Sequence, residues 1–190
     1  MRTPCPRSAG FTLLELLLVL SIMVVLAGLV LPGSMSGLRD QLESTAQILA
    51  GDLAYGRGLA VANASSYRFS FDLTANTYAL QHCGANAALN NLPAFPFVGP
   101  QDTPTRHVVA LADLPRMGPP VQLEAILGSQ SGLSAVDVAF GPLGETSRAE
   151  DTTIWLSVAQ GPQKRYLPIT INHVTGLATV GSYSGQGPYP

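Results

Sequence analysis

The chain has 190 residues, of which only 12% are charged, and its formal net charge at pH 7 is −2. Its 19 glycines and 15 prolines favour a loop-rich β domain over a helical bundle. The lack of excess positive charge argues against non-specific binding to nucleic acid, which requires basic side chains to neutralise phosphates.

Residues 1–10 form a short leader that carries Arg2 and Arg7, and an apolar segment follows over residues 11–31. A helix of these 21 residues is about 30 Å long, enough to span the hydrocarbon core of a bilayer. Its single charged residue is Glu15. A carboxylate in lipid costs about 2.5–3.5 kcal/mol, which indicates a functional role with a partner elsewhere. Because the basic residues lie on the leader side, we expect the leader to stay in the cytoplasm and the rest of the chain to cross the membrane.

Two ordinary targeting segments are the alternatives to a functional helix. In a secretory signal peptide, Arg2 and Arg7 would form the basic region and cleavage would follow Ala27. In an uncleaved signal anchor, the same segment would remain as a plain membrane helix. The position of Glu15 within the apolar run and the length of that run argue against both. A lipoprotein is not supported, because no cysteine follows Gly28.

Pro32 and Gly33 follow the apolar segment and predict a kink or a local loosening of the helix. Beyond them, apolar residues recur mainly at three- and fourfold spacing from Leu38 to Ala60, and the charged residues lie off that stripe. This pattern predicts an amphipathic helix over residues 34–63. We expect it to continue the apolar segment as one long N-terminal helix whose second half packs on a sheet.

The remainder of the chain shows short β-type patterns separated by turn signals. Residues 67–71 and 77–80 flank a turn at residues 72–76, which predicts a β-hairpin. Residues 84–105 are rich in Asn, Ala, Pro and Gly and predict a long loop. Further strands are predicted at residues 106–111, 121–127, 135–140, 152–159, 165–172 and 177–180.

The residues that could carry chemistry are scattered along the chain. His82, His107 and His173 lack the spacing of a metal site, and we expect them to be surface or strand-end histidines. The segments 33–37 and 128–132 have Met and Gln where a nucleophile elbow requires serine, and no phosphate-binding loop occurs. The sequence therefore predicts no catalytic residue, no cofactor and no metal.

Two further features are a cluster of acidic residues around Arg148 and the cysteine Cys83. Glu145, Glu150 and Asp151 flank a loop with Arg148, which favours a solvated charged turn over a calcium site. Cys83 would be the only cysteine left after removal of the leader, and an unpaired thiol in an oxidising compartment is usually buried.

The N-terminal segment resembles the signature of type IV pilins and type II secretion pseudopilins. The matching residues are Gly10, Phe11 and Glu15, in the apolar context that the signature requires. The resemblance implies that a prepilin peptidase cuts between Gly10 and Phe11 and that the new amino terminus of Phe11 is methylated. It also implies that Glu15 pairs with the positively charged amino terminus of a neighbouring subunit during assembly.

Motifs in the second half are similar to those of the H-type minor pseudopilins, the GspH/FimT-like family, and of related minor pilins. They comprise a Phe-Gly turn, a central strand and a final hairpin through a Thr-Gly pair, at residues 140–144, 154–158, 169–172 and 175–178. Members of that family often have a basic residue after the Thr-Gly pair, where this chain has Leu177 and Ala178. This departure weakens any role in binding nucleic acid.

The resemblance implies an α+β, pilin-like fold in which a long N-terminal helix packs on an antiparallel β-sheet head. We expect a leader at 1–10, a transmembrane and assembly helix at 11–31 and the amphipathic half of the helix at 32–63. A periplasmic β-rich head would follow at 64–180, and the small, polar tail at 181–190 is predicted to be disordered.

The function implied is that of a minor pseudopilin, a non-enzymatic structural subunit of the type II secretion pseudopilus that serves protein export across the outer membrane. Its partners would be other major and minor pseudopilins, the prepilin peptidase and the inner-membrane assembly platform, with no nucleic acid. The chain would cross the inner membrane once, with its C-terminal domain in the periplasm. A minor pilin of a type IV pilus, acting in pilus assembly or DNA uptake, and a membrane-tethered periplasmic enzyme are the alternatives.

Overall fold

The computed structural model describes residues 12–30, 34–95, 99–115, 119–159 and 161–189. The chain divides into two compact units, residues 1–36 and residues 37–190.

The N-terminal unit contains helix α1, Leu13–Val30. Every described side chain from Thr12 to Leu26 is exposed. The expected transmembrane segment at 11–31 begins and ends on residues outside the described ranges, as do the residues between α1 and the next helix. Among the described residues, no helix combines the length and the hydropathy that crossing a membrane requires.

The second unit contains eight strands and one long helix, whose first three residues fall in the first unit. Their bounds are α2 Ser34–Ala62, β1 Tyr67–Asp72, β2 Thr77–His82, β3 Arg106–Ala110, β4 Gln122–Gly128, β5 Asp137–Phe140, β6 Thr152–Val158, β7 Arg165–Ile171 and β8 Ala178–Val180. Two short 3₁₀ helices, η1 Ala87–Asn90 and η2 Gly161–Gln163, interrupt the loops. The predicted helix and each predicted strand are present to within two residues at either end, and the α+β class is confirmed.

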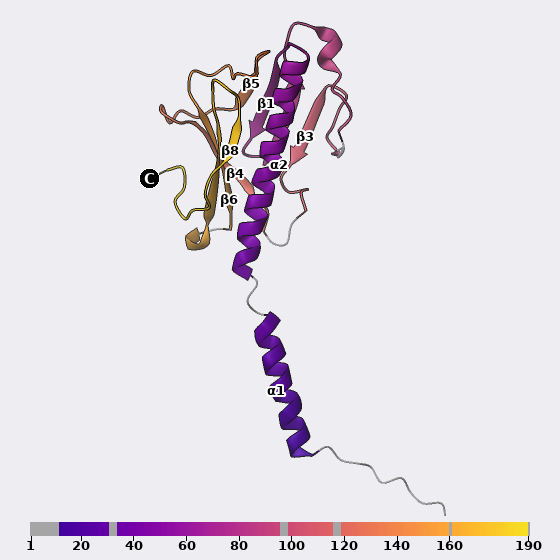
Figure 1. Ribbon diagram of the computed structural model, residues 1–190, viewed down its shortest axis with the longest axis vertical. Coiled ribbons are helices and arrows are strands. Elements are labelled where there is room, and N and C mark those ends of the chain that lie inside the picture. Colours follow the sequence, from indigo (N-terminus) through magenta and orange to yellow (C-terminus); the bar gives the residue numbers. More distant parts are fainter. Residues whose placement is uncertain (1–11, 31–33, 96–98, 116–118, 160, 190) are drawn as a thin grey trace, which may run out of the picture. The chain divides into compact units, whose positions relative to one another are not determined.

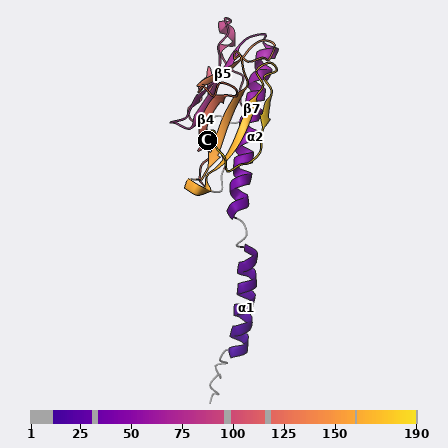
Figure 2. The ribbon, with the colours of Figure 1, turned by 90° about the vertical axis from the view of Figure 1, so that its left-hand side faces the viewer.

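The strands form two four-stranded antiparallel sheets, in the orders β3-β2-β1-β5 and β4-β6-β7-β8. The sequence patterns predict a single sheet, and the presence of two sheets corrects that prediction. The chain leaves the first sheet after β3, pairs β4 with β6 in the second, and returns to the first through β5, which pairs with β1. Strand patterns indicate which face of each strand is buried, but not which strands pair, and the division was therefore not predictable. Figures 1 and 2 show the two sheets from two sides.

The β1–β2 pair is the expected hairpin. Its register runs from Tyr67 opposite His82 to Asp72 opposite Thr77. The Asp72 carboxylate accepts two backbone N–H groups in the turn, at 2.9 and 2.8 Å, and Asn76 ends the turn with a φ of 56°. Asp and Asn favour such turns because their short side chains bond the local backbone.

Helix α2 supplies one wall of the hydrophobic core. The side chains of Leu42, Ala46, Leu49, Leu53 and Ala60 are at most 1% exposed, which confirms the amphipathic pattern. They pack with the inward-facing aromatic and branched residues of both sheets. The apolar stripe of α2 therefore packs against both sheets and joins them in one hydrophobic core.

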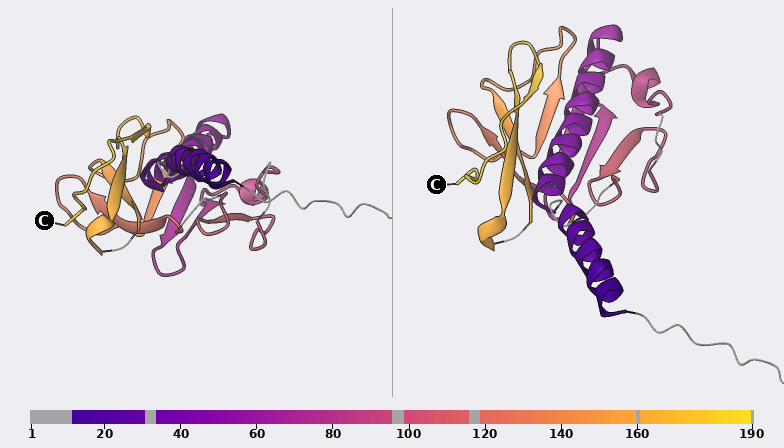
Figure 3. Two further views of the ribbon diagram at one scale, coloured as in Figure 1. Left: turned by 90° about the horizontal axis from the view of Figure 1, so that it is seen from below. Right: turned by 60° about the horizontal axis from the view of Figure 1, so that its bottom comes forward.

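Side chains on opposite flanks of α2 contact different sheets. Arg57 donates from Nε to the Thr175 carbonyl at 2.7 Å, beside β8, and Arg39 lies 5.9 Å over the ring of Tyr183. On the other flank, the Tyr78 hydroxyl of β2 donates to Asp52 at 2.5 Å. Figure 1 shows β6 and β8 to one side of α2 and β3 to the other, and Figure 3 gives two further views of the ribbon.

The residues after β8 continue along β7 rather than extending into solvent. Ser184 and Tyr166 exchange two backbone hydrogen bonds at 2.8 and 2.9 Å, and the Gly181 N–H donates to Pro168 at 2.8 Å. Tyr183 packs against the core. Residues 181–189 therefore differ from the disorder that their composition predicts, because β7 offers them backbone partners and α2 offers an arginine.

Gly56 marks the closest approach of α2 to the first sheet. A Cβ atom at this position would overlap the ring of Phe69 on β1 and lie 3.2 Å from Leu80 on β2. Gly58, two residues further on, is exposed and has nothing within 4 Å of the corresponding point. Close packing of the helix therefore requires glycine at position 56 but not at position 58, although both residues lie within the helix.

Replacing each glycine by alanine should have opposite effects on the free energy of unfolding. Gly56→Ala should lower it by about 1–3 kcal/mol, because the added methyl group overpacks the helix against β1. Gly58→Ala should raise it by about 1 kcal/mol, because alanine is the better helix former at an open position. Chemical unfolding of the full chain in detergent, followed by circular dichroism, measures both. Equal effects of the two substitutions would contradict the close approach at Gly56.

Candidate functional site

The expected processing site lies at the edge of the described structure. Gly10 and Phe11, where cleavage and methylation are predicted, are outside the described residues, and the description begins at Thr12. Of the predicted functional residues, the structure therefore places only Glu15, which is exposed in the first turn of α1.

Thr12 and Glu15 together begin helix α1. The Glu15 N–H donates to the Thr12 hydroxyl oxygen at 3.2 Å, which is the N-terminal capping interaction of a helix. A glutamate three residues after the capping threonine has the spacing of a capping box, and its charge is favourable at the positive end of the helix dipole. Glu15 therefore has a local role in starting the helix, whatever partner it has in an assembly.

The rest of α1 offers no other charged group. Its large apolar side chains from Leu13 to Leu26 are all exposed, and those of Leu13, Leu14, Ile22, Met23 and Val24 are at least half exposed. Apolar side chains face every direction around the helix axis, because the sequence has no polar stripe. A helix that is apolar on all sides requires an apolar environment or partner helices.

The three histidines each contact polar side chains that lie between 5 and 22 residues away in the sequence. The closest ring contacts are His82 with Ser65 and Asn90, His107 with Asp102, and His173 with Asp151. His82 and His107 lie at or next to the end of a strand, which is one of the two expected placements, but each is only 8% exposed and neither is a surface residue. No group of three metal-ligating side chains that could share an ion occurs in the described part of the chain.

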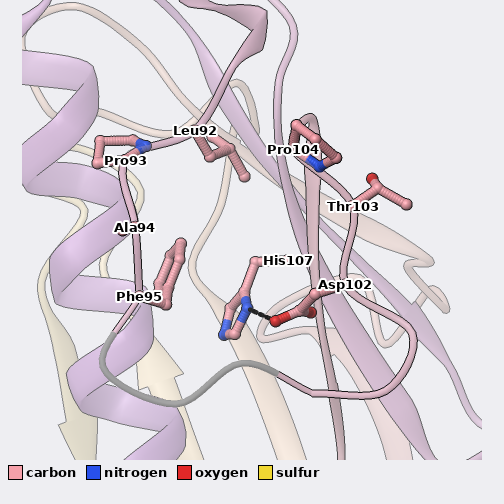
Figure 4. A pocket seen from close by; sticks show the side chains of 8 residues that line it. All are labelled: Leu92, Pro93, Ala94, Phe95, Asp102, Thr103, Pro104 and His107. Atoms are coloured by element: carbon pink, nitrogen blue, oxygen red, sulfur yellow. Dashed lines mark hydrogen bonds and ion pairs between the residues drawn. The ribbon is translucent and has the colours of Figure 1, made fainter.

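A cavity of about 280 Å³ lies beside His107 (Figure 4). It is lined by Leu92, Pro93, Ala94, Phe95, Asp102, Thr103, Pro104 and His107. The Phe95 ring stacks on the His107 ring with centroids 3.7 Å apart, and His107 Nδ1 lies 2.8 Å from Asp102 Oδ2. The loop that carries Phe95 and Asp102 is thereby fixed to strand β3.

Asp102 closes the outer edge of β3. Its carboxylate accepts the N–H groups of Val108 at 2.6 Å and Gly99 at 2.8 Å, in addition to His107. Burial alone would raise the pKa of Asp102, but these donors together lower it below its usual range. Thr103 is the only hydroxyl residue in the lining, and its oxygen is shared with Thr105 and the Arg106 carbonyl at 3.5 Å. The arrangement is that of a strand-edge cap, with no nucleophile directed at the imidazole.

Asp52 and Tyr78 form a second buried polar pair between α2 and β2. Burial raises the pKa of Asp52, and burial, followed by the proximity of Asp52, raises the pKa of Tyr78. A protonated phenol donating to a carboxylate is a stable arrangement at neutral pH. The pair therefore fixes the helix to the sheet.

The acidic residues of the charged turn do not converge on one point. Glu145 accepts the Leu143 N–H, Glu150 accepts N–H groups of Gln130 and Ser131, and Asp151 accepts the His173 N–H. The pKa of Glu150 is lowered chiefly by the Ser131 hydroxyl, and that of Asp151 by His173. These carboxylates serve separate loops, in keeping with a structural turn rather than a calcium site.

Cys83 is free and only half-buried, directly after β2. Burial raises the pKa of its thiol, which makes it a poor nucleophile at neutral pH.

Comparison with known protein families gives one match, over the N-terminal segment. Residues 5–31 match the prokaryotic N-terminal methylation motif, which includes Gly10, Phe11 and Glu15. The N-terminal resemblance inferred from the sequence is confirmed at the level of that motif. No curated protein matches the chain.

Two solved structures resemble the chain, both of them crystal structures of the type IV minor pilin FimU of Pseudomonas aeruginosa. In space group P21 it has 16% identity to this chain and a TM-score of 0.47, covering 80% of this chain and 97% of that chain. In space group P65 the values are 14% and 0.44, covering 78% and 100%. Identities and TM-scores at this level do not identify the function of the chain.

Proposed function

We propose that the chain is a minor pseudopilin, a structural subunit built into the periplasmic pseudopilus of a type II secretion system. The observation that carries the proposal is the methylation motif at residues 5–31, which contains the helix α1 with apolar side chains on all sides. Such a helix cannot remain exposed to water, and the motif supplies a route by which it is processed and assembled.

The proposed anchor is the segment 11–31, held in the inner membrane with the head in the periplasm. Arg2 and Arg7 lie before the apolar segment, and positive charge favours the cytoplasmic side. The prepilin peptidase would cut between Gly10 and Phe11 on that side and methylate Phe11. The leader would then be lost, and the amino group of Phe11 would become a positive charge at the start of the helix.

The proposed role of Glu15 is to pair with the Phe11 amino group of a neighbouring subunit. Each charge is costly alone in a medium of low dielectric constant, and pairing offsets much of that cost. Because Glu15 lies in the first turn of α1, the pair would fix the axial position of one helix relative to the next. The apolar side chains of α1 would then supply the packing surface between subunits and with the assembly platform.

The head is consistent with a structural subunit because strand edges in it are closed by its own loops. Asp102 caps β3, and the Asn76 amide bonds Val121 and Leu123 at the start of β4, each at 2.8 Å. The Ser147 N–H bonds the outer edge of β5 at 2.9 Å. Closed edges prevent uncontrolled sheet-to-sheet pairing, so assembly can be governed by the N-terminal helix.

Gly10→Val should block removal of the leader. A branched side chain should not fit where the peptidase accepts glycine, so the chain should retain residues 1–10 and lack methylation. Mass spectrometry of the protein recovered from membranes measures this directly. Ala9→Val, one position earlier in the same leader, is the matched control and should be processed normally. Normal processing of Gly10→Val would contradict the assignment of the cleavage site.

Substitutions of Glu15 should test its charge pairing separately from its role in capping helix α1. Glu15→Gln keeps the length and the capping spacing of the side chain but removes its charge, whereas Glu15→Leu removes both. Both variants should insert in the membrane and be processed, because the cleavage site lies one turn earlier. Both should lose incorporation into the pseudopilus, while Glu15→Asp should retain part of it.

Crosslinking to the other pseudopilins, together with a secretion assay and membrane fractionation, measures these outcomes. Normal crosslinks and normal secretion in Glu15→Gln would contradict the charge pairing. Loss of pili with intact secretion, after deletion of the gene, would instead assign the chain to a type IV pilus. Loss of neither would reject both assembly roles.

A further inference from the structure

Three polar side chains near the end of α2 are joined by two consecutive hydrogen bonds. The Ser65 hydroxyl oxygen is 2.7 Å from Nε2 of His82, and Nδ1 of the same ring is 2.8 Å from Oδ1 of Asn90. Ser65 lies in the turn after α2, His82 is the last residue of β2 and Asn90 is the last residue of η1. This serine, histidine and asparagine relay is separate from both the N-terminal segment and the cavity beside His107.

The hydrogen-bonding capacity of the three groups fixes where the protons lie. The Asn90 amide oxygen carries no proton, so the hydrogen atom between it and the imidazole is on Nδ1 of His82. In the neutral ring, Nε2 then has a free lone pair, and the Ser65 hydroxyl must be the donor. A serine that donates to a histidine whose other nitrogen is held by a third group has the geometry of an activated nucleophile.

The imidazole is held firmly in this position. The hairpin register places His82 opposite Tyr67, and the two rings meet edge to face with centroids 5.1 Å apart. The Cys83 N–H donates to the Ser66 carbonyl at 2.9 Å, which extends the pairing beside the relay. His82 is only 8% exposed, whereas Ser65 is half-buried. The base is therefore fixed and the nucleophile remains accessible.

The backbone before Ser65 is held by the hydrogen bonds that end helix α2. Helix α2 ends with hydrogen bonds from Ala64 to Val61 and from Ser65 to Ala60, at 3.2 and 3.0 Å. These place Ala64 at a φ of 44°, a left-handed conformation that costs a non-glycine residue about 1–2 kcal/mol. These bonds form a C-terminal cap of the helix, and the cap fixes the backbone directly before the relay.

Gly84 packs directly against the relay. A Cβ atom on Gly84 would overlap the Ser65 hydroxyl oxygen and lie 2.8 Å from Nε2 of His82 and 3.1 Å from the Ser66 nitrogen. Within the described residues, no hydrogen bond is made by the Ser66 N–H. Glycine at this position therefore lets the backbone after β2 approach the Ser65 hydroxyl and the His82 ring closely, with the Ser66 N–H beside them.

We propose that Ser65 is an activated nucleophile that takes up an acyl group from a carboxylic ester. The Ser65 oxygen would attack the ester carbonyl carbon while its proton passes to Nε2 of His82. The ester C–O bond would then break, and the departing alkoxide would take that proton and leave as an alcohol, which yields an O-acyl serine. Asn90 is a positioning residue, and the Ser66 N–H is a backbone donor that lies near the relay.

The chemical class of the acyl donor follows from the identity of the third residue of the relay, Asn90. Asparagine orients the ring, but it adds no negative charge to stabilise the imidazolium ion. With this limited assistance, an ester with a good leaving group fits the site better than an amide does. The inference goes beyond the proposed assembly function, and it does not depend on it.

The test uses the full chain in detergent and a fluorophosphonate, which reacts with activated serines. The Ser65 oxygen would attack phosphorus, the P–F bond would break, fluoride would leave and the proton would pass to His82. Mass spectrometry of the tryptic peptide of residues 58–68 should show one adduct on Ser65. Ser65→Ala should abolish it, and Ser131→Ala, which removes a serine bonded to Glu150 instead of a histidine, should leave it unchanged.

Variants of the two supporting residues test the relay itself. His82→Gln should slow labelling about a hundredfold, the contribution of a general base. Asn90→Leu should slow it by at least about tenfold, whereas Asn90→Asp should match or exceed the rate of the unaltered chain, because aspartate also orients Nδ1. Thermal unfolding identifies any variant that fails to fold. An unlabelled Ser65 in the unaltered chain would overturn the proposal, as would labelling at the same rate in a folded His82→Gln variant.

Discussion

The packing of the apolar stripe of α2 against two sheets is the interaction on which the head depends. Neither sheet has a complete core without the helix, because Leu42, Leu49 and Leu53 are fully buried between them. Gly56 allows the helix to approach β1 closely, and Arg57 and Asp52 attach it to opposite sheets. The turn that ends α2 then positions Ser65 beside β2, so the proposed nucleophile is also a consequence of how the helix is held.

Much of the fold was predictable because its signals are local. The strands β1 and β2, the turn between them and helix α2 are each encoded in a continuous stretch of alternating or helical pattern. The N-terminal motif is likewise linear, so Gly10, Phe11 and Glu15 could be identified without a structure. The division into two sheets and the pairing of the tail with β7 could not be identified, because they depend on which strands meet in space.

The side-chain relays were missed for the same reason. Ser65 and His82 are 17 residues apart, and only the register of the β1–β2 hairpin brings them together. A search for a serine with glycines at fixed spacing does not find such a site, because the relay is assembled across a hairpin. The signal that could have pointed to it is the predicted hairpin itself, with a serine just before one strand and a histidine at the end of the other.

The central claim is that the chain is processed as a prepilin, and the mass of the mature N-terminal peptide tests it most directly. The protein should be isolated from the membranes of cells that contain the peptidase and digested for mass spectrometry. The account predicts that the first residue is Phe11 and that it carries one methyl group on its amino nitrogen. A mature chain that begins at Gly28 would show cleavage by an ordinary signal peptidase after Ala27 and would contradict the account.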